Sequence, residues 1–186
     1  MRRLTSMALA LVLASATGCS SGGSGNDSGN SSAPAETTEQ FTQGGRSMEP
    51  GIKPGQVISA RHVTNYTAKR GDVVLFHPPK DWTATGSPML KRVLAVAGET
   101  IACCNTAGKI TVDGVPLDEP YVATDGPLDA QPDPHTCGPR RFGPVKVPES
   151  SIFVVGDNRT ASNDSRCVGS IPASAVFAVV TTGAGG

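Results

Sequence analysis

The sequence predicts a mainly β fold, a barrel or a sandwich of short strands with long loops. Its 22 glycines and 15 prolines among 186 residues disfavour a bundle of helices. Short runs rich in β-branched residues recur between turn signals, and no stretch of ten residues has helical periodicity. We therefore expect one turn-rich domain of modest size.

Six segments carry the strand pattern, and each is bounded by turn residues. The first follows Pro54-Gly55, the second lies between Arg70-Gly71 and Pro78-Pro79, and the fourth is a tight hairpin closed at Asp113-Gly114. The segments span residues 56–63, 72–77, 89–97, 110–117, 151–155 and 175–181. Residues 123–148 hold six prolines, so we expect a long surface loop there.

The first nineteen residues resemble an export signal. Arg2 and Arg3 precede an apolar run that is too short to span a membrane as a helix. Residues 16–19 (ATGC) look like a lipobox, in which Cys19 is lipidated and becomes the mature N-terminus. Residues 14–16 also form an A-x-A site, whose cleavage gives a soluble protein starting at Thr17. We favour the lipoprotein because a Ser/Gly tract follows Cys19 directly.

The predicted organisation has four parts. Residues 1–19 form the signal and lipobox, 20–40 a flexible tether, 41–182 the folded domain and 183–186 a tail. The tether begins with a tract made only of Ser, Gly, Asn and Asp, which contains nothing to bury. Its root-mean-square span is about 25 Å, so a lipid on Cys19 would hold the domain close to the outer face of the cytoplasmic membrane.

Charge and cysteine content exclude several classes of function. Sixteen basic residues balance sixteen acidic ones, which argues against a nucleic-acid partner. Besides Cys19 there are four cysteines, and none forms a C-x-x-C pair, so we expect no metal and no cofactor. Outside the cytoplasm these cysteines form one or two disulfides, or some stay free. Because adjacent cysteines rarely bond each other, we expect Cys103 or Cys104 to pair with Cys137, with Cys167 as a further candidate.

Two residues are candidates for nucleophilic chemistry. Ser47 lies between glycines and Pro50, in a sequence that suits an exposed turn. Lys91 lies inside an apolar strand, where alternation places it on one face with Val93 and Ala95, and Arg92 on the other. If buried there, its ammonium loses solvation, its pKa falls and it can take the proton of a serine. The alternative is that Lys91 extends along the surface into water.

The third candidate is the polar loop at residues 156–166 (GDNRTASNDSR), directly after a strand. Taken with two further stretches, these segments resemble the bacterial type I signal peptidases from about Gly44 to Phe177. The motifs that carry the resemblance are residues 47–50 (SMEP), 70–74 (RGDVV), 91–99 (KRVLAVAGE), 112–121 (VDGVPLDEPY) and 156–166, in the order of the family.

The resemblance implies a β-rich signal-peptidase fold and a Ser/Lys dyad that cleaves Ala-x-Ala signal peptides from preproteins. It makes Ser47 the nucleophile and Lys91 the general base, with the Ser47 N–H as an oxyanion donor. Ser162 would orient the Lys91 amine, while Asp164 and Arg166 brace the site. Substrates would bind as an added strand, and we expect a monomer.

The chain departs from the family pattern at several positions. Gly51-Ile52 follow Pro50, Gly45 lies two residues before Ser47, and Thr160-Ala161 replace an acid and an amide. We expect the tether and a lipid on Cys19 to replace the transmembrane anchor of the family. Three alternatives follow: a narrow-substrate Ser/Lys peptidase, a non-catalytic peptide-binding lipoprotein, or a self-cleaving repressor. The chain lacks a helix-turn-helix, which excludes the repressor.

Overall fold

The structure is a computed structural model that describes residues 37–80, 82, 86–123, 125–129, 137 and 141–182. The chain divides into two units, residues 1–34 and 35–186, and all described residues belong to the second. The expected export signal, lipobox, most of the tether and the tail therefore lie outside the described residues. Among those described, no helix is long and apolar enough to cross a membrane.

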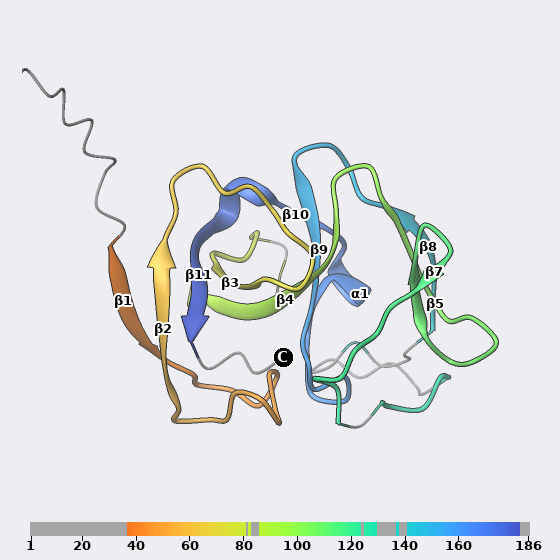
Figure 1. Ribbon diagram of the computed structural model, residues 1–186, viewed down its shortest axis with the longest axis horizontal. Coiled ribbons are helices and arrows are strands. Elements are labelled where there is room, and N and C mark those ends of the chain that lie inside the picture. The colour runs from red at the N-terminus through yellow and green to blue at the C-terminus, as the bar shows by residue number, and fades with distance from the viewer. Residues whose placement is uncertain are drawn as a thin grey trace, which may run out of the picture. The chain divides into compact units, whose positions relative to one another are not determined.

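The second unit consists of two antiparallel sheets (Figure 1). The larger sheet has the order β1-β2-β11-β3-β4-β9-β10 and the smaller one β7-β6-β5-β8. The larger sheet comprises β1 (Thr38–Thr42), β2 (Val57–His62), β11 (Val176–Thr182), β3 (Val73–Phe76), β4 (Met89–Val96), β9 (Ser151–Val155) and β10 (Ile171–Pro172). The smaller comprises β7 (Val115–Pro116), β6 (Ile110–Val112), β5 (Thr100–Cys103) and β8 (Phe142–Lys146). The mainly β prediction is confirmed.

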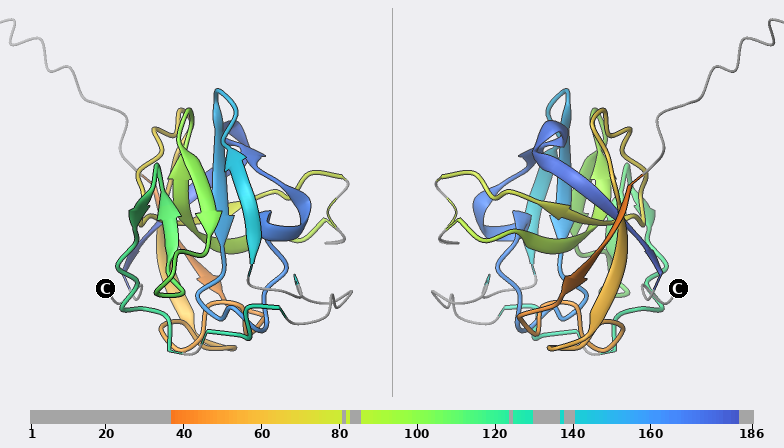
Figure 2. Two further views of the ribbon diagram at one scale, coloured as in Figure 1. Left: turned by 90° about the vertical axis from the view of Figure 1, so that its right-hand side faces the viewer. Right: turned by 90° about the vertical axis from the view of Figure 1, so that its left-hand side faces the viewer.

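Helical structure is confined to two short pieces, α1 (Ser165–Val168) and a 3₁₀ turn (Ala173–Ala175), among the described residues. The larger sheet curls, and the smaller one lies beside its β4–β9 region (Figure 1). Figure 2 shows β3 and β4 extending together to one side of the body. Near the middle of β4, the register with β9 shifts between Val93 and Ala95, which is the signature of a bulge.

The buried apolar side chains form three clusters around β4. One lies where the smaller sheet meets β4 and β9 and includes Leu94, Ile101 and Phe153. A second lies around β2, β3 and β11 and includes Met48 and Ile52. The third includes Val93 and Trp82. The Trp82 ring packs edge-on against the Phe76 ring, with 5.6 Å between the ring centroids. Because β4 contributes to all three clusters, it is buried on both faces and can hold a charged side chain away from water.

The structure confirms the predicted strands to within a residue or two at their ends and corrects other expectations. β1 (Thr38–Thr42) is a strand that the sequence analysis did not predict. β8 lies inside the predicted proline-rich loop and accommodates Pro144 within its five residues. The predicted hairpin turn is present, with φ of 50° at Asp113 and 80° at Gly114, the conformation of the tightest hairpin turns.

The expected face of β4 is also corrected. The bulge puts Val93 opposite Val154 and Ala95 opposite Phe153, and these pairs belong to different buried clusters. Strict alternation therefore fails beyond Val93. The side chains of Lys91 and Arg92 do point to opposite faces of β4, since Lys91 contacts Ser47 and Arg92 contacts Asp157.

Candidate active site

Ser47 lies in the loop between β1 and β2, and two apolar side chains hold this loop in place. Met48 and Ile52 are 0% and 1% exposed, and the Ile52 N–H donates to the Met48 carbonyl at 2.9 Å. The neighbouring Ser47 remains partly exposed. Burial of the flanking side chains therefore presents the serine at the surface of a rigid loop.

Lys91 approaches this serine from the first half of β4. Its side chain is buried, and its Nζ donates hydrogen bonds to Ser47 Oγ at 2.9 Å and to the Leu90 carbonyl at 3.0 Å. The alternative in which Lys91 extends along the surface is therefore excluded. The two residues that the sequence singled out for chemistry, 44 positions apart, are in direct contact.

Burial changes the acidity of the lysine. Loss of solvation lowers the pKa of Lys91 from 10.5 to about 8, while the Asp164 charge raises it and the Arg166 charge lowers it. At pH 7 roughly a tenth of such a lysine is neutral, against fewer than about one in a thousand for an ordinary lysine. Lys91 can therefore act as a base at physiological pH.

The turn after β9 packs directly against Ser47. Gly156 has no room for a side chain, because a Cβ there would overlap the Ser47 carbonyl oxygen and the Ser162 side chain. The Asn158 N–H donates to the same Ser47 carbonyl at 3.0 Å. Gly156 is thus the position at which the loop of residues 156–166 meets the serine, and the sequence analysis gave it no role.

Asp164 organises the rest of this loop. Its carboxylate accepts from Arg166 Nε at 2.8 Å, from the Gly156 N–H at 3.0 Å and from Ser162 Oγ at 2.6 Å. Burial would raise the pKa of Asp164, but the Arg166 charge and these hydrogen bonds outweigh it and lower the pKa. Asp164 and Arg166 thus form a buried ion pair, while their role in bracing the site stays a prediction. Ser162, expected to bond the Lys91 amine, instead donates to Asp164.

Two more arginines hold the start of the loop. Arg92 makes a fork of hydrogen bonds to Asp157, at 2.9 and 2.8 Å. Arg159 donates to the Gly156 carbonyl at 3.2 Å and forms an ion pair with Glu119. The sequence analysis expected charge pairing in this loop but did not find these partners, since they lie on β4 and beyond β7. The sequence did offer one signal for these ion pairs, because three separate motifs each contain charged residues and together they contain both signs of charge.

The structure joins Cys137 to Cys167 and Cys103 to Cys104. This corrects the expected pairing of Cys103 or Cys104 with Cys137. Cys167 lies in α1, next to Arg166, so its bond connects residue 137 to the end of the loop of residues 156–166. Spacing along the chain could not reveal this, because the approach of residue 137 to α1 is set by the fold.

Comparison of the sequence with known protein families shows to which family the chain belongs. The sequence model described as "Signal peptidase, peptidase S26" matches residues 35–182, which include every candidate residue of the site. The chain belongs to the S26 signal peptidase family. Ser47, Lys91 and the loop of residues 156–166 are thus the candidate active site of an S26 family member.

Relatives within this family include curated signal peptidases. The chain is 43% identical over 91 residues to Signal peptidase I of Mycobacterium tuberculosis, covering 49% of this chain and 29% of that protein. It is 33% identical over 128 residues to Signal peptidase I of Bacillus amyloliquefaciens, covering 68% and 64%. The chain thus spans less than two thirds of the length of either relative.

A crystal structure of a signal peptidase I from Enterococcus faecalis aligns with a TM-score of 0.48 at 27% identity, covering 62% of this chain and 98% of that one. The assignment to the S26 family rests on the sequence match over residues 35–182.

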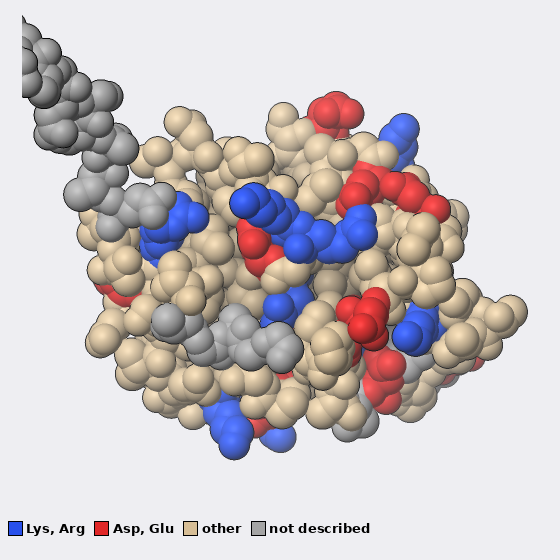
Figure 3. All heavy atoms as spheres, in the orientation of Figure 1, with Lys and Arg blue, Asp and Glu red and all other residues tan. Residues whose placement is uncertain are grey.

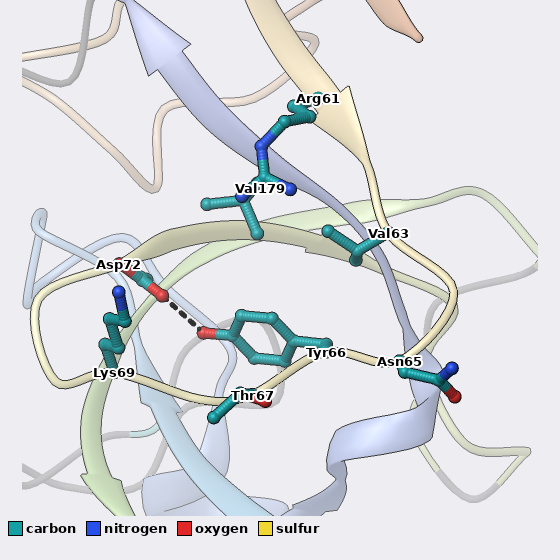
Figure 4. A pocket seen from close by; sticks show the side chains of 8 residues that line it. All are labelled: Arg61, Val63, Asn65, Tyr66, Thr67, Lys69, Asp72 and Val179. Atoms are coloured by element: carbon teal, nitrogen blue, oxygen red, sulfur yellow. Dashed lines mark hydrogen bonds between the residues drawn. The ribbon is translucent and has the colours of Figure 1, made fainter. Parts of the chain in front are cut away.

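Two cavities lie near the candidate active site or elsewhere on the folded unit. A cavity of about 130 Å³ beside the candidate active site is lined by residues that include Glu49 and Asn158. A larger one, of about 270 Å³, lies between the β2–β3 connection and β11, where Tyr66 donates to Asp72 at 2.8 Å (Figure 4). Neither Ser47 nor Lys91 lines this larger cavity. On the face in Figure 3, basic side chains lie next to acidic ones.

Proposed function

We propose that this chain is a serine endopeptidase that cleaves Ala-x-Ala signal peptides from exported preproteins, with Ser47 as nucleophile and Lys91 as general base. The observation that carries the proposal is the buried Lys91 amine, with its lowered pKa, 2.9 Å from Ser47 Oγ. The membership of the S26 family and the names of the relatives support the same activity.

The reaction has two halves. Neutral Lys91 takes the proton of Ser47 as Oγ attacks the scissile carbonyl carbon, and a tetrahedral oxyanion forms. The resulting ammonium then protonates the leaving amine, the peptide bond breaks and the signal peptide stays on Ser47 as an ester. In the second half, Lys91 deprotonates a water that attacks the ester, and the proton returns to Ser47 Oγ. No cofactor is required.

Two further observations support this reaction. Within the described part of the chain, the Ser47 N–H donates to no protein acceptor, so it can donate to the oxyanion. On β4, the ladder to β3 covers Met89–Arg92 while the ladder to β9 begins only at Arg92. The other edge of Met89–Lys91 can therefore accept an extended substrate as an added strand.

The site of action is part of the proposal. Lipidation of Cys19 would hold the peptidase at the outer face of the cytoplasmic membrane, where preproteins emerge. A domain on a tether with a root-mean-square span of about 25 Å stays within reach of signal peptides in that membrane. We propose that it acts there as a monomer.

The deciding experiment is cleavage of a preprotein with an Ala-x-Ala site by the detergent-solubilised protein. Ser47→Ala and Lys91→Met should each abolish turnover with an unchanged circular dichroism spectrum, because each removes one half of the proton transfer. Lys146→Met is the matched control, since Lys146 is exposed on β8, and it should keep full activity.

Other results would change the assignment. No turnover of several preproteins by folded wild-type protein would contradict general signal peptide cleavage and leave a narrow-substrate peptidase. Peptide binding that persists in Ser47→Ala, with no cleavage by the wild type, would indicate a peptide-binding lipoprotein.

A further inference from the structure

The turn that contacts Ser47 is held from a distance by the segment that follows the β6–β7 hairpin. This segment, residues 117–122, contains Glu119 and Tyr121. The Glu119 carboxylate accepts hydrogen bonds from both terminal nitrogens of Arg159, from NH1 at 3.3 Å and from NH2 at a shorter distance. The Glu119 side chain is 12% exposed and that of Arg159 1%, so the pair is largely shielded from water.

Tyr121 engages the second arginine of the turn. The Arg92 guanidinium lies 4.0 Å from the centroid of the Tyr121 ring, a cation–π contact. The same guanidinium makes the fork to Asp157. The Tyr121 hydroxyl donates to Glu119 at 3.1 Å, and burial raises the pKa of this hydroxyl, which keeps it protonated as a donor. The two residues therefore act as one unit.

A continuous path of contacts leads from this unit to the nucleophile. Glu119 binds Arg159, and Arg159 donates to the Gly156 carbonyl at 3.2 Å. Gly156 packs so closely against the Ser47 carbonyl that a Cβ would not fit between them. Asn158, next to Arg159, donates its N–H to the same carbonyl at 3.0 Å. A shift of the Arg159 side chain thus moves the groups that fix the backbone of Ser47.

We propose that Glu119 and Tyr121 are positioning residues for Ser47, acting through Arg159 and Arg92 on the turn at Gly156–Asn158. The inference rests on the proposed function. A buried guanidinium strongly favours one arrangement in which its charge is matched, so the pair holds the turn in one place. Asp125, 3.9 Å from Arg159 and 44% exposed, is too distant and too open to water to replace Glu119.

Glu119→Gln tests the proposal because it keeps the shape of the side chain and removes its charge. We expect kcat for an Ala-x-Ala preprotein to fall by about 10- to 100-fold, as misplacement of a reacting atom by about 1 Å does, with KM changed less than about twofold. Tyr121→Phe keeps the ring on Arg92 and loses only the hydroxyl, so a smaller fall is expected. Asp118→Asn is the matched control, an exposed neighbouring acid, and should leave kcat unchanged.

A double-mutant cycle separates positioning from general damage. If Glu119 acts through Arg159, Glu119→Gln combined with Arg159→Gln should lower kcat no more than the worse single change. Multiplying effects would overturn the proposed path, and so would an unchanged kcat in folded Glu119→Gln. If Glu119→Gln does not fold, Tyr121→Phe and Glu119→Asp carry the same test, and an unchanged kcat in both overturns it.

A second readout keeps the two proposals apart. The rate at which a small activated ester acylates Ser47, followed by intact mass, needs no preprotein. Slower acylation in Glu119→Gln with wild-type protein that cleaves no preprotein would uphold the positioning role and overturn the proposed function. Equal acylation rates in wild type and Glu119→Gln, with preprotein cleaved normally by both, would do the reverse.

Discussion

Lys91 is buried, has a lowered pKa and lies next to the Ser47 hydroxyl. Its side chain is 3% exposed, and loss of solvation is the largest cause of the lowered pKa. The adjacent cation, Arg92, is also buried but pairs with Asp157. One strand thus holds two buried cations, of which the paired one supports structure and the one beside a serine is suited to chemistry.

The pH dependence of turnover follows from this difference. Because neutral Lys91 is the proposed base, kcat/KM for an Ala-x-Ala preprotein should rise with pH through an apparent pKa of about 8 and level off above it, since this profile reports groups of the free enzyme. Initial rates between pH 6 and 10 measure it. A profile that stays flat across this range would show that Lys91 is not the titrating base.

The loop of residues 156–166 works as an element because Asp164 ties its two ends together. The carboxylate caps α1 by accepting from the Arg166 N–H, and it reaches back to Gly156 at the start of the loop. Ser162, between them, donates to the same group. A single buried carboxylate therefore sets the shape of the segment that packs on Ser47.

Asp164→Asn should lower the free energy of unfolding at pH 7 by about 3–5 kcal/mol, because it leaves the buried Arg166 without its partner. The pKa of Asp164 is lower in the folded protein, so its contribution is present at neutral pH and is lost as pH falls through that pKa. Urea unfolding should thus show a smaller difference between variant and wild type at pH 3 than at pH 7. An equal difference at both pH values would mean that the carboxylate charge is not the cause.

The molecule as a whole brings its site together at the junction of two sheets. The larger sheet contributes Lys91 and the turn after β9, while the smaller sheet contributes Glu119 and Tyr121 from the segment beyond β7. The buried cluster with Leu94, Ile101 and Phe153 holds the two sheets together. The residues that match the S26 family, 35–182, all belong to this folded unit.

The lipid anchor is a prediction at the same scale. The mature protein in the membrane fraction should carry a diacylglycerol adduct on an N-terminal Cys19, and Cys19→Ala should release the domain from that fraction. Mass spectrometry of the mature N-terminus is the measurement. An unmodified N-terminus at Thr17 would instead indicate cleavage at the A-x-A site and a soluble enzyme.

The sequence by itself determined the fold class, and its resemblance to the signal peptidases named the two residues of the proposed dyad. Turn residues and β-branched runs depend on local backbone preferences, so strands such as 151–155 and the Asp113-Gly114 turn could be predicted. Ser47 and Lys91 were each an ordinary signal alone, and the order of five motifs along the chain is what indicated the dyad. The position of a carboxylate or an arginine partner is not a local property.

Only the tertiary structure decided how those residues are supported. The bulge in β4, the Cys137–Cys167 bond, the close packing of Gly156 on Ser47 and the Glu119–Arg159 pair all join segments distant in sequence. β8 was missed because the six prolines of residues 123–148 indicated a surface loop. Burial is what shifts the pKa of Lys91, and burial arises only when β3, β4 and the Ser47 loop pack together.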